Sequence, residues 1–156
     1  MLIVGSDFID NNTSFNTVLK KNGDKVFIKA YATSGAAIGI PKFIQFMGSG
    51  YAATAIVASN YGFVGIAEKA ISSGSVGWMQ IRGEVEDAQA YAASKFTGSA
   101  GKHAVFILGT TVGIGATSSA YVGDAELGQV GVLMEAASGS TTSNIYLTGV
   151  WATPIA

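Results

Sequence analysis

A hydrolytic site of the serine type would have to use His103, the only histidine in the chain. Such a site pairs a histidine base with a serine that is often held in a Gly-x-Ser-x-Gly turn. The sequence contains no such motif. His103 follows Lys102 at the start of an apolar stretch, so we expect a strand-edge histidine with a local hydrogen bond. No catalytic residue is predicted, and the chain is not expected to be an enzyme.

Glu84 and Glu86 are the carboxylates whose spacing could serve chemistry. Residues two apart on a strand share a face, so this pair, followed by Asp87, could reach a sugar or a divalent cation. The alternative is a solvated outer face on which Arg82 offers the charges a partner. The glycine-rich stretch 109–115 lacks the Lys-Ser/Thr of a phosphate-binding loop. No metal or cofactor site is predicted.

The densest positive charge lies in Lys20, Lys21, Lys25 and Lys29, with Asp24 inside the run. This pattern indicates either docking to an acidic surface or an ordinary solvated strand edge.

Trp78 falls on the outward face of a predicted strand, and such a tryptophan is a candidate anchor for another subunit. The alternative is a tryptophan covered by the chain's own N-terminal arm. The predicted partner-contact residues are Phe8, Phe15, Lys20, Lys21, Trp78 and Arg82.

The composition limits the class of protein and its partners. Charged residues make up only 12% of the 156 positions and hydrophobic residues 49%, which excludes a disordered chain and suits one domain. A surface with so little charge dissolves poorly, so we expect other subunits to cover much of it. The net charge is −1 with a single arginine, so nucleic acid is not an expected partner. The absence of cysteine removes disulfides and thiol chemistry.

No membrane association is expected. The first residues, Met1-Leu2-Ile3-Val4-Gly5, lack the basic and long apolar regions of a signal peptide. Two charge-free runs, 43–67 and 103–123, are long enough for a membrane helix but are interrupted by glycine and polar turns. These interruptions favour buried strands.

The predicted architecture is all-β, a β-sandwich or barrel-like domain over residues 25–156 behind an extended N-terminal arm, residues 1–24. Short alternating or apolar segments separated by glycine turns predict the strands. They lie at 25–31, 42–47, 52–58, 63–70, 77–85, 103–108 and 128–136. Residues 86–96 could form a helix or a loop.

A strand-turn-strand unit occurs twice in the sequence, at residues 62–85 and 128–151. Six of the 22 positions from 62 to 83 are identical when the chain is shifted by 66 residues. In each copy the apolar positions share one phase, which predicts two hairpins on a shared core. The inward residues would be Met79, Ile81, Val85, Ile145, Leu147 and Trp151, and the outward residues of the first copy would be Trp78, Gln80, Arg82 and Glu84.

Gly62-Phe63-Val64-Gly65-Ile66-Ala67, the turn at 72–75 and Trp78-Met79-Gln80-Ile81-Arg82-Gly83 resemble a pattern common in small virion proteins of tailed phages. The later copy resembles its C-terminal counterpart, although Asn144 stands where the first copy has Trp78. The resemblance is to capsid decoration, or cement, proteins. It implies a β-rich, often trimeric protein that sits on the outer shell and locks neighbouring capsomers.

The sequence therefore predicts a non-enzymatic structural protein of a virion, localised to the capsid surface. Its expected partners are the major capsid protein and further copies of itself, most simply a homotrimer. A tail or head-fibre subunit of a phage virion is the first alternative. The second is a carbohydrate-binding β-sandwich that uses Trp78 and the face of Glu84 and Glu86.

Overall fold

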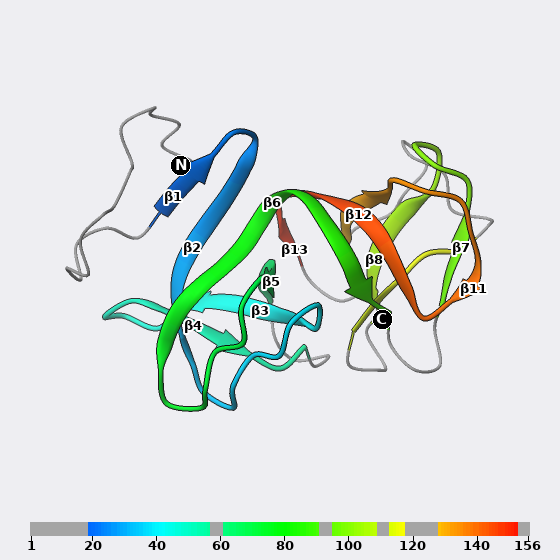
Figure 1. Ribbon diagram of the computed structural model, residues 1–156. Helices are drawn as coiled ribbons and strands as arrows, with labels where there is room; N and C mark the ends of the chain where they lie inside the picture. Colours follow the sequence, from blue (N-terminus) through cyan, green and yellow to red (C-terminus); the bar gives the residue numbers. More distant parts are fainter. Residues whose placement is uncertain (1–18, 57–60, 91–94, 109–112, 118–127, 153–156) are drawn as a thin grey trace.

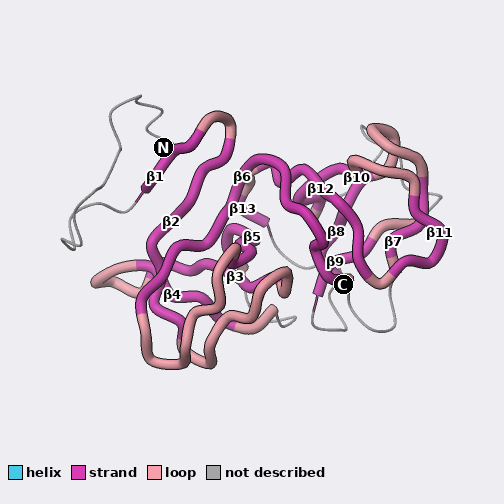
Figure 2. Tube along the Cα trace, in the orientation of Figure 1, coloured by secondary structure: helices cyan, strands magenta, loops and turns pink. Residues whose placement is uncertain are grey.

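The computed structural model describes residues 19–56, 61–90, 95–108, 113–117 and 128–152. Within these ranges the chain forms strands and loops only, as Figure 2 shows, and no helix able to cross a membrane occurs there. The strands are β1 (Leu19–Asn22), β2 (Lys25–Ala32), β3 (Pro41–Phe46), β4 (Tyr51–Thr54), β5 (Gly62–Ala67), β6 (Val76–Gln89), β7 (Phe96–Gly98), β8 (Ala104–Leu108), β9 (Gly113–Gly115), β10 (Gln129–Leu133), β11 (Ala137–Ser140), β12 (Thr142–Thr148) and β13 (Trp151–Ala152). The predicted all-β class is confirmed.

Five strands close into a mixed barrel. Around the ring the order is β2, β4, β3, β5 and β6, and β6 pairs again with β2. β2 and β4 are parallel, whereas the other neighbours are antiparallel. These strands form the left half of the molecule in Figure 1. Of the two forms expected from the sequence, this part of the chain takes the barrel.

Small residues make the narrow barrel possible. Its interior holds alanines from β2, β4 and β5 between larger side chains such as Ile28, Ile44 and Met79, all of them buried. A Cβ on Gly65 of β5 would lie 2.8 Å from the side chain of Ile44 on β3, so glycine is required where β5 and β3 meet. Each fully buried isoleucine contributes about 1.5–3 kcal/mol relative to an exposed one.

β6 leaves the barrel and continues the same hydrogen-bonded sheet through strands in the order β6, β12, β10, β8 and β9. We call this part of it, outside the barrel, the second sheet. All neighbours in this part are antiparallel. β7 and β11 form a separate two-stranded sheet beside it. Figure 1 shows this second half on the right, joined to the barrel by the long curve of β6.

A second core lies between the outer wall of the barrel and the second sheet. The barrel contributes Phe43, Val64 and Ile66 from β3 and β5. The second half contributes residues that include Phe96, Ile107, Ile114, Leu133 and Ile145, all fully buried. One wall of the barrel is therefore buried on both faces, which fixes the two halves against each other.

The two predicted copies contain strand pairs with the same register. In the first, Ile66 lies opposite Gln80 and Ala67 opposite Met79. In the second, Val132 lies opposite Tyr146 and Leu133 opposite Ile145. Every one of these partners differs by the same 66 residues, as the sequence repeat requires.

The six residues predicted to share one core do not share it. Met79 and Ile81 point into the barrel, Val85, Ile145 and Leu147 belong to the second core, and Trp151 is 47% exposed. The cause lies in β6, where Val26 pairs with Arg82 but Phe27 pairs with Gln80, leaving Ile81 as an extra residue. Gly83 comes next but one with a φ of +94°, so the strand bends between the two cores.

Two predicted boundaries are wrong. Residues 19–24 were assigned to an extended arm, but β1 pairs with β2 around the turn at Gly23 and Asp24, so they belong to the barrel domain. Residues 1–18 lie outside the described residues. Residues 86–96 were expected to form a helix or a loop. Both expectations are wrong for residues 86–89, because β6 continues to Gln89 in pairing with β12.

Candidate partner-contact surface

Trp78 lies on the outer face of the barrel, half-buried between two lysines. Lys29 is its cross-strand neighbour on β2, and its Nζ lies 5.1 Å from the centroid of the Trp78 ring. Lys20 of β1 approaches from the next strand, with Nζ 5.9 Å from the same centroid and 5.5 Å from that of Phe27. Ammonium groups at such distances are attracted by the ring quadrupole. The aromatic side chains therefore attract both ammonium groups.

A recess of about 430 Å³ opens beside Trp78, where β5 and β6 diverge. The pairing of these strands stops at Ala67 and Met79. The chain that connects the two strands continues from there through the exposed residues Glu68 and Lys69. Residues that line the recess include Lys20, Phe27, Glu68, Lys69, Val76 and Trp78. We call Lys20, Phe27, Lys29, Lys69, Val76 and Trp78 the lysine–tryptophan surface.

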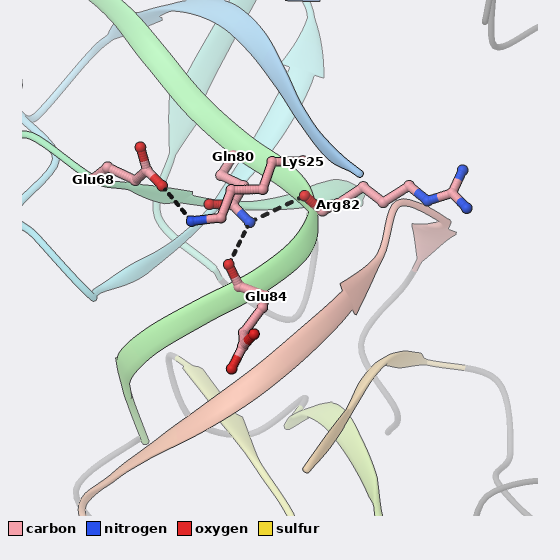
Figure 3. A network of polar contacts seen from close by, with 5 residues as sticks. All are labelled: Lys25, Glu68, Gln80, Arg82 and Glu84. Carbon is pink, nitrogen blue, oxygen red and sulfur yellow. Dashed lines mark hydrogen bonds and ion pairs between the residues drawn. The ribbon is translucent and has the colours of Figure 1, made fainter. Parts of the chain in front are cut away.

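The charge of this surface is positive. Glu68, the acidic residue that lines the recess, already forms an ion pair with Lys25 at 2.9 Å (Figure 3). Within the described parts of the chain, Lys20 and Lys69 form no ion pair. An anionic group that entered the recess would meet ammonium groups supported by aromatic rings.

The structure brings together two of the six predicted contact residues, Lys20 and Trp78. Lys21 is exposed and, as the next residue on β1, points to the opposite face. Arg82 is half-buried, and its side chain points away from Glu84 and Lys25 in Figure 3. Phe8 and Phe15 lie outside the described residues.

The acidic residues Glu84, Glu86 and Asp87 lie outside the recess at Trp78, and all three are exposed. The predicted pairing of these charges with Arg82 is not found among the described residues. The described ranges also contain no group of three His, Cys, Asp or Glu residues that could hold a metal ion. Asp87 instead marks a bulge, with a φ of +51° and its N–H donating to Asn144 Oδ1 at 3.1 Å.

Gln80 was predicted to point outward into solvent, and it is fully buried. Its Nε2 donates to the carbonyl oxygens of Arg82 at 3.0 Å and Glu84 at 2.9 Å (Figure 3). The bend at Gly83 brings these carbonyls over the amide. Gln80 Oε1 has no hydrogen-bond partner among the described residues. The side chain thus stabilises the bulge from which β6 passes into the second sheet.

His103 makes the local hydrogen bond expected of it. Its Nδ1 accepts from the Ser99 N–H at 2.7 Å. The ring is buried, and it lies so close to Gly98 that any side chain at that position would collide with it. This contact is made to the main chain of Ser99.

Sequence reasoning missed an aromatic group at one end of the barrel. Trp151 of β13 pairs with Phe63 of β5, and the two rings meet edge to face at 5.1 Å. Tyr61 lies 5.7 Å from Trp151, and Phe46 packs on Tyr51 at 5.4 Å. Of these, Phe46, Tyr61 and Trp151 are about half exposed.

We call Phe46, Tyr51, Tyr61, Phe63 and Trp151 the aromatic end. Gln45 joins its two parts, because its Nε2 donates to the Tyr61 carbonyl at 2.8 Å. Gly149 is the residue in the sequence that could have indicated the aromatic end. Its φ of +72° changes the direction of the chain after β12, as Gly83 changes the direction of β6 in the first copy. The prediction continued the inward and outward alternation of the second copy past Gly149, and so it placed Trp151 in the core.

Comparison with known protein families, curated proteins and solved structures found no match to this chain.

Proposed function

We propose that the protein is a non-enzymatic structural component of a phage virion, which binds the outer surface of the capsid and stabilises contacts between capsomers. The resemblance of the duplicated unit to capsid decoration proteins motivates this proposal. Its partners are the major capsid protein and further copies of the same chain.

The observation that carries the proposal is the aromatic end. Large aromatic side chains left exposed beside one another mark protein interaction sites in chains of this size. Phe46, Tyr61 and Trp151 are 59%, 53% and 47% exposed, and they lie on a closed barrel. A barrel that presents apolar rings at one end and lysines on its outer wall suits a bridging role better than a catalytic one.

The two surfaces suit different partners. Permanent interfaces between identical subunits resemble a protein core and exclude charge. The aromatic end has this chemistry, so we assign it to self-association, with a homotrimer as the proposed state. The lysine–tryptophan surface has the chemistry of a contact with a different, acidic partner.

Replacing Trp151 with Ser tests self-association. The variant should shift toward the monomer in light scattering across a concentration series, because it removes the ring that joins Tyr61 and Phe63. Met134→Ser removes an exposed apolar side chain from the second half of the molecule and should leave the oligomer unchanged. A wild-type chain that stays monomeric at high concentration would overturn the assignment.

Attachment to particles tests the virion role. Capsids from a phage that lacks the gene should bind the purified chain in a fixed ratio and then withstand a higher temperature before rupture. Co-sedimentation and a thermal release assay measure the two effects. Absence of binding contradicts the proposal, and binding confined to isolated tails would favour the tail-subunit alternative.

The matched registers of the two strand pairs support a duplicated unit within the fold. Glycines at equivalent positions serve equivalent purposes, since Gly83 and Gly149 both have positive φ. Beyond these glycines the two copies differ, because β6 continues into the second sheet whereas β12 ends before β13 turns back to β5. We infer that one copy closes the barrel and the other builds the sheet beside it.

A further inference from the structure

We propose that copies of the chain associate head to tail, with the aromatic end of one copy packed against a loop surface at the other end of the barrel of the next copy. This inference rests on the self-association proposed above and adds the surface that receives the aromatic end. It is carried by two exposed apolar surfaces at the two ends of β3, one of which contains a recess.

The receiving surface is formed by two loops, residues 33–40 between β2 and β3 and residues 68–75 between β5 and β6. Both loops lie at the lower side of the barrel half in Figure 2. A recess of about 380 Å³ opens between them, lined mostly by small or apolar residues. Ile40 lines this recess, and both Ile40 and Ile38 are exposed. We call the following residues the loop end: Ala36, Ala37, Ile38, Ile40, Ala70 and Ile71.

Main-chain hydrogen bonds join the two loops of the loop end. The Ala36 N–H donates to the Ile71 carbonyl at 2.8 Å, and the Ile71 N–H donates back to the Ala36 carbonyl at 2.9 Å. The Ala32 N–H donates to the Ser75 carbonyl at 2.9 Å, and the Gly74 N–H donates to the Ala32 carbonyl at the same distance. Because these bonds already connect the loops, a side chain that enters the recess has less backbone to order.

β3 separates the loop end from the aromatic end. Ile40 directly precedes this strand and Phe46 is its last residue, so about 20 Å of extended chain lies between them. The loop from β3 to β4, which begins with the exposed Met47, projects from the left side of the barrel in Figure 1. A projecting apolar surface fits a recess better than it fits a second projecting surface.

The chemistry of the two ends is complementary. The aromatic end consists of aromatic residues alone, and the recess at the loop end is lined by alanine and isoleucine. Lys42 is the charged residue in this lining, and its Nζ donates to Ser34 Oγ at 3.4 Å. An ammonium group beside an apolar recess is attracted by the face of an aromatic ring. A ring that enters the recess therefore meets apolar contacts and a favourable charge.

The aromatic end is large enough for one side of an interface. Aromatic side chains bury about 150–250 Å² each, so three half-exposed rings offer roughly 225–375 Å². A standard interface buries about 800 Å² per partner, of which about 480 Å² is apolar. The exposed Met47 and Val150 supply much of the difference.

The proposed homotrimer requires a head-to-tail contact. Each subunit of a threefold ring presents one surface to one neighbour and a different surface to the other. Contact between two aromatic ends would give a dimer instead and would leave both loop ends in water. A head-to-tail ring covers both apolar surfaces of every copy.

Replacing Ala37 with Glu tests the loop end, because it places a carboxylate at the exposed wall of the recess. The dissociation constant for self-association should rise at least about tenfold in sedimentation velocity across a concentration series, since the interface would bury an unpaired charge. The matched control is Ala100→Glu, the same change at an exposed alanine in the second half of the molecule. It should associate like the wild type.

A mixture of two defective variants tests the direction of the contact. Ala37→Glu keeps the aromatic end and Trp151→Ser keeps the loop end, so each should be monomeric alone while an equal mixture forms a heterodimer. The double variant with both changes should not pair with Trp151→Ser. Native mass spectrometry identifies the heterodimer, and its formation shows that both variants are folded.

The outcomes separate this inference from the proposed function. If Ala37→Glu associates like the wild type while Trp151→Ser is monomeric, or if the mixture stays monomeric, the head-to-tail contact is wrong and self-association through the aromatic end stands. A wild-type chain that is monomeric throughout overturns both. A wild-type mass that grows steadily with concentration supports the head-to-tail contact and contradicts the homotrimer, because heterologous contacts that do not close form filaments.

Discussion

Gln80 has a structural role, because its side-chain amide forms hydrogen bonds within the fold. It is fully buried, and its amide supplies hydrogen bonds to the carbonyl oxygens of Arg82 and Glu84. A β-bulge leaves main-chain groups without strand partners, and buried groups without hydrogen bonds are costly. The side chain therefore replaces part of the ladder that the extra residue Ile81 interrupts.

Replacing Gln80 with Met should lower the free energy of unfolding by about 1–3 kcal/mol, because the variant keeps the bulk of the side chain and removes both hydrogen bonds. Urea denaturation measures the change. Gln89→Met, on the exposed end of the same strand, should change stability by no more than about 0.5 kcal/mol. Equal stability of the Gln80 variant and the wild type would show that the bulge does not depend on the amide.

At this scale the sequence predicts chemistry better than location. The local hydrogen bond of His103 follows from its place at a strand edge, and it is confirmed. Its burial depends on the close approach of Gly98 to the ring, which no local sequence pattern indicates. Lys20 meets Trp78 for a similar reason, since their contact requires β1 and β6 to flank β2.

At the scale of elements, β6 is the strand on which the architecture depends. Its first part closes the barrel with β2 and β5, and its last part pairs with β12. The change of direction occurs at Gly83, where a Cβ would lie 2.9 Å from the Cα of Lys25 in addition to requiring a positive φ. Both features demand glycine.

Gly83→Ala should therefore destabilise the protein by about 1–3 kcal/mol, the cost of holding a side chain in a strained backbone region. Thermal and urea unfolding measure it. The control is Gly50→Ala, where the added methyl group meets open space. If both alanine variants are equally stable, the bend in β6 does not require the conformation described.

The alternation of apolar residues predicted the main strands, because a period of two is a local property. The end of β6 escaped prediction since alanines at 88 and 90 favour a helix locally, while the pairing of Gln89 with Thr142 holds the chain extended. Short strands such as β7 and β11 have too few residues to show any period. The β5–β6 and β10–β12 pairs were predictable through the repeat.

At the scale of the whole molecule, two cores share the strands that separate them. Phe43 and Ile44 are adjacent on β3 but face opposite cores, and Val64 and Gly65 do the same on β5. Loss of β3 and β5 would therefore expose the cores of both halves. The closed ring itself could not be predicted, because the parallel pairing of β2 with β4 and the return of β6 to β2 join segments without any local signal.

Residues 1–18 are expected to serve attachment to the particle and not the stability of the fold. Because β1 begins at Leu19 and pairs with β2, removing residues 1–18 should leave the midpoint of urea unfolding unchanged. Attachment to capsids should weaken by about tenfold, a loss of about 1.4 kcal/mol, if this segment adds backbone hydrogen bonds to a neighbouring subunit.

The matched variant removes residues 1–22 and with them all of β1. It should lose stability, because Phe27 and Trp78 lose the lysine that lies against them and β2 loses its edge partner. The two truncations thus distinguish a segment that serves the particle from a strand that serves the fold. Capsid binding of the shorter truncation at full strength would mean that the contacts predicted for Phe8 and Phe15 do not contribute to attachment, and that the barrel surface alone holds the protein in place.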